Sequence, residues 1–169
     1  MMRGTTVLWK YAIGILFGAI SAQAQAADFF VRPGGSGNGA SWSTAAGSPG
    51  SAPSGSTVYV AGGSYGNWNL SGKSNLIVRR ATASSHGSDT GWVSSYDSQV
   101  VLTGGGDCIN ITSGSGNIII DGVVKNGIWA YRCGYHSIRS TVPNMTFRNL
   151  ELGAEGTNRN GEDGIQGGG

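Results

Sequence analysis

The chain has 169 residues, of which 31 are glycine and 12% are charged, with 11 basic against 9 acidic side chains. This composition excludes a fold built mainly of helices, because glycine is a poor helix former. It also excludes a highly charged disordered chain, since apolar and β-branched residues recur in short runs. The length is that of about one domain.

The first 26 residues have the features of a secretory signal peptide. Arg3 and Lys10 precede the apolar run 11–20, and small residues at 21–26 offer a cleavage site. The run is too short to span a bilayer, and the alternative, an N-terminal membrane anchor, lacks a stop-transfer pattern. We therefore expect a secreted protein, extracellular or periplasmic. Without Arg3 and Lys10 the charges balance, which predicts no nucleic-acid partner and no membrane association after signal removal.

Two interleaved series of short apolar segments follow, separated by corners rich in Gly, Asn and Ser. The first series begins with an amide residue and comprises NLIVRR (75–80), QVVLTG (99–104), NIIIDG (117–122) and NMTFRN (144–149). The second comprises CINI (108–111), GIWA (127–130) and GIQG (164–167). The first series recurs at intervals of 18 to 27 residues, which predicts an all-β solenoid whose coils stack at about 4.8 Å with parallel strands.

The two series imply specific neighbours. One parallel ladder that faces the core is expected to hold Ile119, Val101 and Phe147, and another is expected to hold Ile109, Ile128 and Ile165. The amides expected to stack at one corner, where they satisfy backbone groups, are those of Asn75, Gln99, Asn117 and Asn144. An immunoglobulin-like sandwich and a jelly roll are the alternatives. A sandwich does not readily explain an amide at the head of each first-series segment.

These segments resemble the coils of secreted right-handed parallel β-helix proteins of the pectin-lyase type, nearest to lyases of uronic-acid polysaccharides. The similar segments are FFVRPGGSGNGASW (29–42), SGSTVYVAGGSYGNWNLSG (54–72) with its Gly-x-Tyr corner, VVLTGGG (100–106) and NIIIDGVVKNG (117–127). The resemblance implies a right-handed parallel β-helix over 57–169, preceded at 27–56 by an initial strand and a Gly/Ser/Pro-rich loop. These motifs are more specific for the fold than for an activity.

The chain departs from this family at two places. Many relatives have an amphipathic helix before the first coil, whereas STAAGSPGSAPSGS (43–56) is too rich in Gly, Pro and Ser to form one, and an irregular loop is expected. The last residues, GEDGIQGGG (161–169), are typical of the middle of a coil and not of a terminal cap. We therefore expect an N-terminal portion of a longer, incomplete β-helix. Whether these residues include the catalytic groups is open.

The segment 129–143, expected to be the longest insertion between coils, combines aromatic and basic side chains. The candidate residues for binding an acidic polysaccharide are Trp129, Tyr131, Arg132, His136 and Arg139. Aromatic faces stack on sugar rings, and arginine binds a carboxylate through two hydrogen bonds. The alternative is that Trp129 and Tyr131 pack against the flank of the solenoid while the arginines are solvated.

Four carboxylates gather in the segment 151–163, of which Glu162 and Asp163 are the candidate metal ligands. Carboxylate oxygens suit Ca²⁺, which is the one cofactor that the sequence suggests, and β-elimination of a uronate requires its carboxylate to be neutralised. The alternative is a solvated acidic loop, because the carboxylates do not have the spacing of an EF-hand.

The two cysteines, Cys108 and Cys133, allow one disulfide in an oxidising compartment or two buried thiols, and spacing does not decide between them. Two functions agree with these features. One is a secreted polysaccharide-active enzyme, a lyase or a glycoside hydrolase of this fold. The other is a non-catalytic surface, adhesive or structural solenoid.

Overall fold

The computed structural model describes residues 27–114, 116–153 and 164–167, and the predicted signal peptide 1–26 lies outside this part. The described chain forms strands joined by loops, with two single-turn 3-10 helices, η1 (Pro49–Ser51) and η2 (Ser94–Tyr96). No helix in these residues is long and apolar enough to cross a membrane. For the described residues, the prediction of an all-β chain is confirmed.

The strands form three sheets, which we name A, B and C. Sheet A holds, in spatial order, β1 (Asp28–Val31), β2 (Thr57–Val60), β5 (Ile77–Arg80), β8 (Ile118–Asp121) and β11 (Met145–Arg148). Sheet B holds β3 (Gly63–Tyr65), β6 (Val100–Gly104), β9 (Ile128–Cys133) and β12 (Leu150–Gly153). Sheet C holds β4 (Trp68–Asn69), β7 (Ile109–Ile111), β10 (Ile138–Ser140) and β13 (Ile165–Gly167). All pairings between these strands are parallel.

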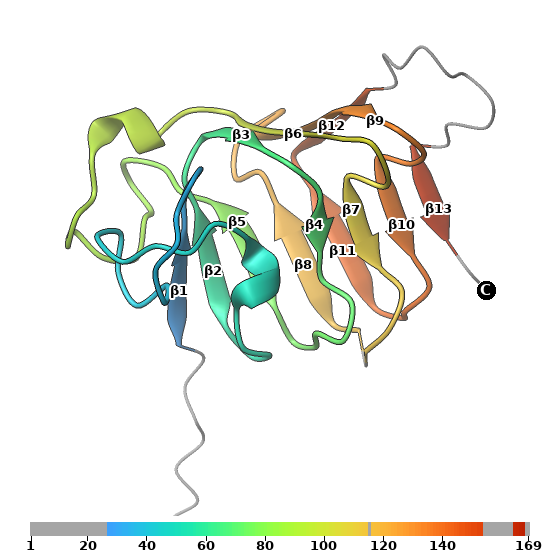
Figure 1. Ribbon diagram of the computed structural model, residues 1–169, viewed down its shortest axis with the longest axis horizontal. Helices are drawn as coiled ribbons and strands as arrows, with labels where there is room; N and C mark the ends of the chain where they lie inside the picture. The colour runs from blue at the N-terminus through green and yellow to red at the C-terminus, as the bar shows by residue number, and fades with distance from the viewer. Residues whose placement is uncertain (1–26, 115, 154–163, 168–169) are drawn as a thin grey trace, which may run out of the picture.

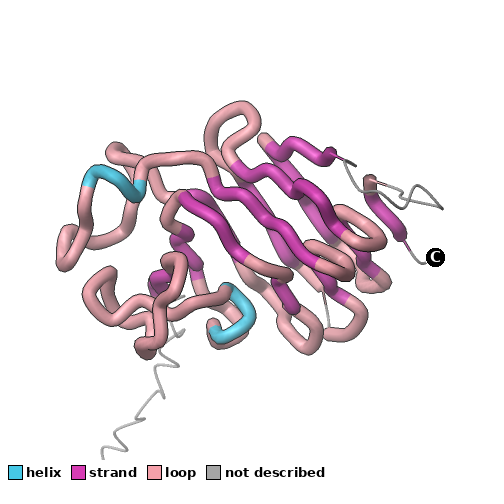
Figure 2. The backbone as a smooth tube through the Cα atoms, turned by 45° about the horizontal axis from the view of Figure 1, so that its top comes forward, coloured by secondary structure: helices cyan, strands magenta, loops and turns pink. Residues whose placement is uncertain are grey.

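The described chain passes through the sheets in the order A, B, C and then returns to A. Each passage is one coil, and the four coils are β2–β3–β4, β5–β6–β7, β8–β9–β10 and β11–β12–β13. Figure 1 shows the sheet A strands of successive coils side by side, and Figure 2 shows the strands stacked in rows with loops at their ends. Each coil therefore satisfies the backbone groups of the next, as in the predicted parallel solenoid.

Apolar side chains that alternate along the strands point between the three sheets and form the main core. In sheet A, Val58, Val78 and Ile120 lie opposite one another and are fully buried. In sheet C, Ile109 and Ile138 are paired in the same way. Burying a side chain of this size contributes about 1.5–3 kcal/mol, so these stacked rows are the principal stabilising contacts.

Two segments lie in a different sheet from the one that the sequence predicts. The segment 99–104 belongs to the first predicted series and 127–130 to the second. In the structure both lie in sheet B, as β6 and the start of β9, with Val100 opposite Ile128. The preceding neighbour of β8 in sheet A is β5. Each coil thus has three strands and not two. The pattern of apolar and polar residues does not separate the sheets, because every strand alternates between an inward and an outward face.

The predicted ladder of Ile119, Val101 and Phe147 is wrong. Val101 is in sheet B, and Ile119 lies opposite Thr146 on the outer face of sheet A. The residue opposite Phe147 is Ile120, which is fully buried. The prediction is therefore shifted by one residue within sheet A, and a shift of one residue exchanges the two faces of a strand.

The second predicted ladder is correct for two of its three members. Ile109 and Ile165 both pair with Ile138, so they lie in sheet C, whereas Ile128 lies in sheet B. The middle strand of this ladder, β10, is not among the segments that the sequence predicts.

Three of the four amides predicted at one corner share the corner between sheets C and A. Asn75, Asn117 and Asn144 have φ angles of 55°, 57° and 57°, a left-handed conformation that asparagine tolerates better than most residues. Asn117 Nδ2 donates to Asn75 Oδ1 at 3.2 Å. The fourth, Gln99, lies elsewhere because its strand belongs to sheet B, and its Nε2 donates to the carbonyl oxygen of Asn126 at 2.8 Å.

A disulfide joins Cys108, just before β7, to Cys133, at the end of β9, with Cα atoms 5.3 Å apart. Of the two alternatives that the sequence allows, the structure has the bridge. Both cysteines are buried in the main core. The bond fastens the second coil to the third at the corner between sheets B and C.

A smaller apolar cluster lies outside sheet A, where two loops meet. The N-terminal loop 32–56, whose only helical turn is η1, contributes Trp42, which is fully buried. The segment 81–99, which is the long insertion between β5 and β6, contributes Trp92 and Tyr96, whose ring centroids lie 5.2 and 5.3 Å from that of Trp42. Aromatic contacts of this kind add to the area that they bury, so they hold the two irregular loops together.

His86 in this insertion is expected to make stability depend on pH near neutrality. Its ring stacks on Trp92 with centroids 4.2 Å apart, and its Nε2 lies 2.7 Å from Asp89 Oδ1. The hydrogen bond to Asp89 raises the pKa of His86 above its ordinary value of 6.5. The resulting stabilisation is fully present below about pH 6.5 and is lost as the pH rises through the folded-state pKa.

Thermal unfolding followed by circular dichroism tests this expectation. Tm should fall between about pH 6 and about pH 8 in the wild type, and Asp89→Asn should remove this fall because the carboxylate is gone. The control Lys125→Gln, at an exposed position in the corner before β9, should retain it. An unchanged pH dependence in Asp89→Asn would show that the His86–Asp89 pair does not contribute.

Candidate functional site

The sequence predicts an insertion between coils at 129–143, and this prediction is wrong. In the structure the segment contains most of β9, the whole of β10 and the connection between these two strands. Its predicted polysaccharide-binding residues therefore lie on both sides of the corner between sheets B and C. The sheet B group comprises Trp129, Tyr131 and Arg132, and the sheet C group comprises His136 and Arg139. The Cys108–Cys133 disulfide lies between the two groups.

The sheet B group forms an aromatic surface on the outside of the solenoid. Trp129 and Tyr131 are two residues apart in β9, so their side chains project from the same face of the strand. Their ring centroids are 4.2 Å apart. The Arg132 guanidinium lies over the Tyr131 ring, 4.9 Å from its centroid. Both rings are half-buried, so they pack against the flank of the strands and still present part of their surface to solvent.

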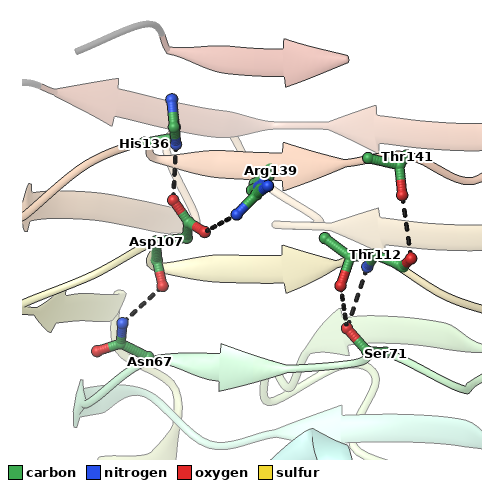
Figure 3. A network of polar contacts seen from close by, with 7 residues as sticks. All are labelled: Asn67, Ser71, Asp107, Thr112, His136, Arg139 and Thr141. Atoms are coloured by element: carbon green, nitrogen blue, oxygen red, sulfur yellow. Dashed lines mark hydrogen bonds and ion pairs between the residues drawn. The ribbon is translucent and has the colours of Figure 1, made fainter. Parts of the chain in front are cut away.

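In the sheet C group, a carboxylate from the preceding coil contacts both predicted residues (Figure 3). Asp107 Oδ1 lies 2.6 Å from His136 Nδ1, and Asp107 Oδ2 lies 3.8 Å from Arg139 Nη1. The side chains of Asp107 and His136 are 11% and 17% exposed, whereas that of Arg139 is 47% exposed. The imidazole is therefore held closely, and the guanidinium is only loosely paired.

Closely stacked glycines position Asp107 at this corner. A side chain at Gly134 would collide with the main chain of Gly105, and one at Gly104 would collide with the side chain of Asn67. Asn67 Nδ2 in turn donates to the main-chain carbonyl oxygen of Asp107 at 2.6 Å (Figure 3). Three successive coils thus fix the connection that bears the carboxylate.

This geometry gives the cluster two chemical capacities. Because Asp107 accepts a hydrogen bond at Nδ1, a neutral His136 carries its proton there and has a lone pair at Nε2. Figure 3 shows the second ring nitrogen on the side away from Asp107. Arg139, half-exposed beside it, can donate to a ligand carboxylate. The cluster therefore combines a proton acceptor with a cation that recognises anions.

The sequence does not predict Asp107 as a site residue. It precedes Cys108, and His136 follows Cys133 by three residues, so the disulfide holds the two side chains near each other. From the sequence alone this signal is ambiguous, because the spacing of the cysteines does not decide whether they are bonded.

The predicted calcium ligands, Glu162 and Asp163, lie outside the described residues. Glu151 is described, and it lies opposite Trp129 in sheet B. Within the described ranges, no group of three or more His, Cys, Asp or Glu residues could hold a metal ion. A calcium site stays a prediction about the segment that contains Glu162 and Asp163.

Comparisons with known proteins assign no family to the chain. A scan against protein-family models and searches of curated proteins and of solved structures found no match. The resemblance to pectin-lyase-type proteins stays a prediction from the motifs quoted above. Function is therefore inferred from the geometry of the site.

Proposed function

We propose that the chain is a secreted right-handed parallel β-helix of the pectin-lyase type that binds polysaccharides containing uronic acids and cleaves them by β-elimination. The stacked coils, each with three parallel strands, support this fold. The disulfide supports an oxidising compartment. The cluster of Asp107, His136 and Arg139 supports the activity.

The observation that carries the proposal is that one carboxylate contacts both a histidine and an arginine. β-Elimination requires a group that neutralises the uronate carboxylate and a base that removes the proton from the carbon next to it. Arg139 is suited to the first task and His136 to the second. Asp107 is suited to stabilise the imidazolium that forms when His136 accepts the proton.

In the proposed reaction, His136 Nε2 takes the proton from the carbon α to the carboxylate. The electron pair left behind forms a double bond to the next ring carbon, and the bond from that carbon to the glycosidic oxygen breaks. The departing oxygen takes a proton from water, and the hydroxide that results is neutralised by the proton of the imidazolium. The products are a shortened chain and an unsaturated uronate that absorbs ultraviolet light.

The sheet B group is suited to hold the sugar chain on the other side of the corner. The faces of Trp129 and Tyr131 can stack on the apolar faces of sugar rings, and Arg132 adds a second cation. The connection between β9 and β10 joins this group to the cluster of Asp107, His136 and Arg139, so one polysaccharide chain can contact both.

Arg139→Ala is expected to weaken binding of a polyuronate by about tenfold or more, because a charge-assisted contact to a carboxylate is lost. Isothermal titration calorimetry of the whole chain, with a neutral glucan for comparison, measures this. The matched control is Arg148→Ala, which removes an arginine of similar exposure, 54%, that pairs with Asp121 on sheet A. Equal effects of the two substitutions would contradict the site.

His136→Gln is expected to abolish the ultraviolet-absorbing product and to leave binding unchanged, because it removes the base and retains the arginine. Binding by the wild type without any product would contradict the lyase activity and leave acidic-polysaccharide binding. Indifference to every glycan would favour the non-catalytic solenoid. Loss of binding on addition of a chelator would support a calcium site in the segment with Glu162 and Asp163.

A further inference from the structure

The long insertion between β5 and β6 covers aromatic rings on the outside of sheet A. Its residue Gly87 lies so close to the rings of Tyr59 and Phe30 that an added Cβ would be 2.8 Å from the first and 3.0 Å from the second. The main-chain carbonyl oxygen of His86 accepts the indole N–H of Trp42 at 3.0 Å. The residues around His86 therefore lie over the aromatic cluster as a cover.

His86 makes contacts that suit its charged form. Its Nδ1 lies 3.1 Å from the carbonyl oxygen of Thr82, and its Nε2 lies 2.7 Å from Asp89 Oδ1. Both partners are acceptors, and a neutral imidazole has only one N–H, so both hydrogen bonds form only in the imidazolium. The ring also stacks on Trp92 with an interplanar angle of 14°, and an aromatic face attracts a cation. Loss of the proton therefore removes one hydrogen bond and weakens the stacking.

His86 is the group in this cluster that is suited to respond to pH near neutrality. Histidine is the side chain that ordinarily changes charge between about pH 5 and 8, and the other histidine of the chain, His136, lies at the corner between sheets B and C. Residues 33–56 of the N-terminal loop contain no titratable side chain. Besides Asp89, the titratable residues of the elements that pack around the cluster are Asp28, Arg32, Tyr59, Arg79, Arg80, Tyr96 and Asp97. Two of these, Arg80 and Asp97, are paired with each other at 2.6 Å.

We propose that the long insertion is a pH-sensitive lid, which a protonated His86 holds closed over the aromatic cluster and which opens when His86 loses its proton. The Asp89 side chain is 97% exposed, so its bond to His86 is the contact that holds it in place. Once His86 is neutral, Asp89 turns to water and residues 86–92 move away from Trp42 and Tyr59. The aromatic surface that the protein offers to its surroundings then depends on pH.

The direction of the pH effect follows from the same contacts. The hydrogen bond to Asp89 raises the pKa of His86, so the closed lid binds the proton more tightly than the open lid does. The closed form is therefore favoured in acid, and it loses this advantage as the pH rises through the pKa of the closed form. The lid does not depend on the proposed function.

Hydrogen exchange of the whole chain, followed by mass spectrometry, measures the opening, because amides in a closed lid exchange slowly. Protection factors corrected for the effect of pH on the chemical exchange rate are compared at about pH 6 and about pH 8.5, on either side of the change in charge. Those of residues 86–92 are expected to fall by about tenfold or more, the loss for one hydrogen bond to a charged group. Those of β8 should stay unchanged, which separates opening of the lid from unfolding of the whole chain.

Two variants are expected to open the lid at both pH values. Asp89→Asn removes the carboxylate. Gly87→Ala adds a methyl group against the Tyr59 ring, at a φ of 73° that alanine rarely adopts, and it changes no charged group. The matched control Asp28→Asn removes an exposed carboxylate at the start of β1 and should behave as the wild type does. Asp89→Glu restores a carboxylate and should recover part of the pH dependence.

Three results overturn the lid. The first is equal protection of residues 86–92 at the two pH values in the wild type. The second is a pH dependence that persists unchanged in Asp89→Asn. The third is a loss of protection in β8 as large as that in 86–92, which would mean that the whole chain unfolds. If Gly87→Ala prevents folding, the comparison of Asp89→Asn with Asp89→Glu decides between the outcomes.

Discussion

Ile120→Asp is expected to unfold the protein. Ile120 is fully buried in the main core, between Val78 of the second coil and Phe147 of the fourth. An unpaired carboxylate at this position costs about 4–5 kcal/mol, which is comparable to the whole stability of a typical domain, about 5–15 kcal/mol. Urea unfolding followed by tryptophan fluorescence measures the loss.

The neighbouring substitution, Ile119→Asp, is the matched control. Ile119 lies on the outer face of sheet A, where it lines a shallow depression with Asn117 and Thr146. A carboxylate there stays in water, so a cost of at most about 1 kcal/mol is expected. If Ile119→Asp were the more damaging of the two, the faces of β8 would be exchanged, as the sequence alone had suggested.

Removing the disulfide is expected to have the second largest effect. The double substitution Cys108→Ala, Cys133→Ala should lower the free energy of unfolding by about 3.5 kcal/mol, because the bond closes a loop with a sequence separation of 25 and so restricts the unfolded chain. Thermal unfolding with and without a reductant provides the measurement.

The reductant should lower the Tm of the wild type and leave that of the double variant unchanged. The double variant should also lose activity towards a polyuronate, since the bond helps to hold Asp107 against His136. A wild type whose Tm is indifferent to reductant would show that the bridge does not form in solution.

The sequence predicts the strands and their parallel stacking because each coil repeats the same apolar pattern. It does not predict which sheet a strand joins. The segments 99–104 and 117–122 look alike, and what separates them is the number of residues in the corners around them, above all the insertion 81–99. The residues of a strand do not depend on the length of the corner before it, so the sequence alone predicts Val101 and Ile119 in one ladder.

The sequence predicts which types of residue form the candidate site, but it does not predict how these residues are arranged in space. His136 and Arg139 stand out as a basic pair in a chain with few charges. Asp107 does not, because it is separated from them in sequence and meets them only through the stacking of the second coil on the third. The aromatic pair Trp129 and Tyr131 shares a segment with His136, but the corner turns the two groups onto different faces.

The corner between sheets A and B has a different length in every coil. It spans 61–62 in the first, 81–99 in the second, 122–127 in the third and Asn149 alone in the fourth. The strands that follow nevertheless begin in register, with Gly63, Val100, Ile128 and Leu150 in one row. Foreign peptides could therefore be grafted between residues 123 and 125 and displayed on the surface. The stacked strands tolerate loops of different lengths at this corner, which makes the protein a scaffold for engineered loops.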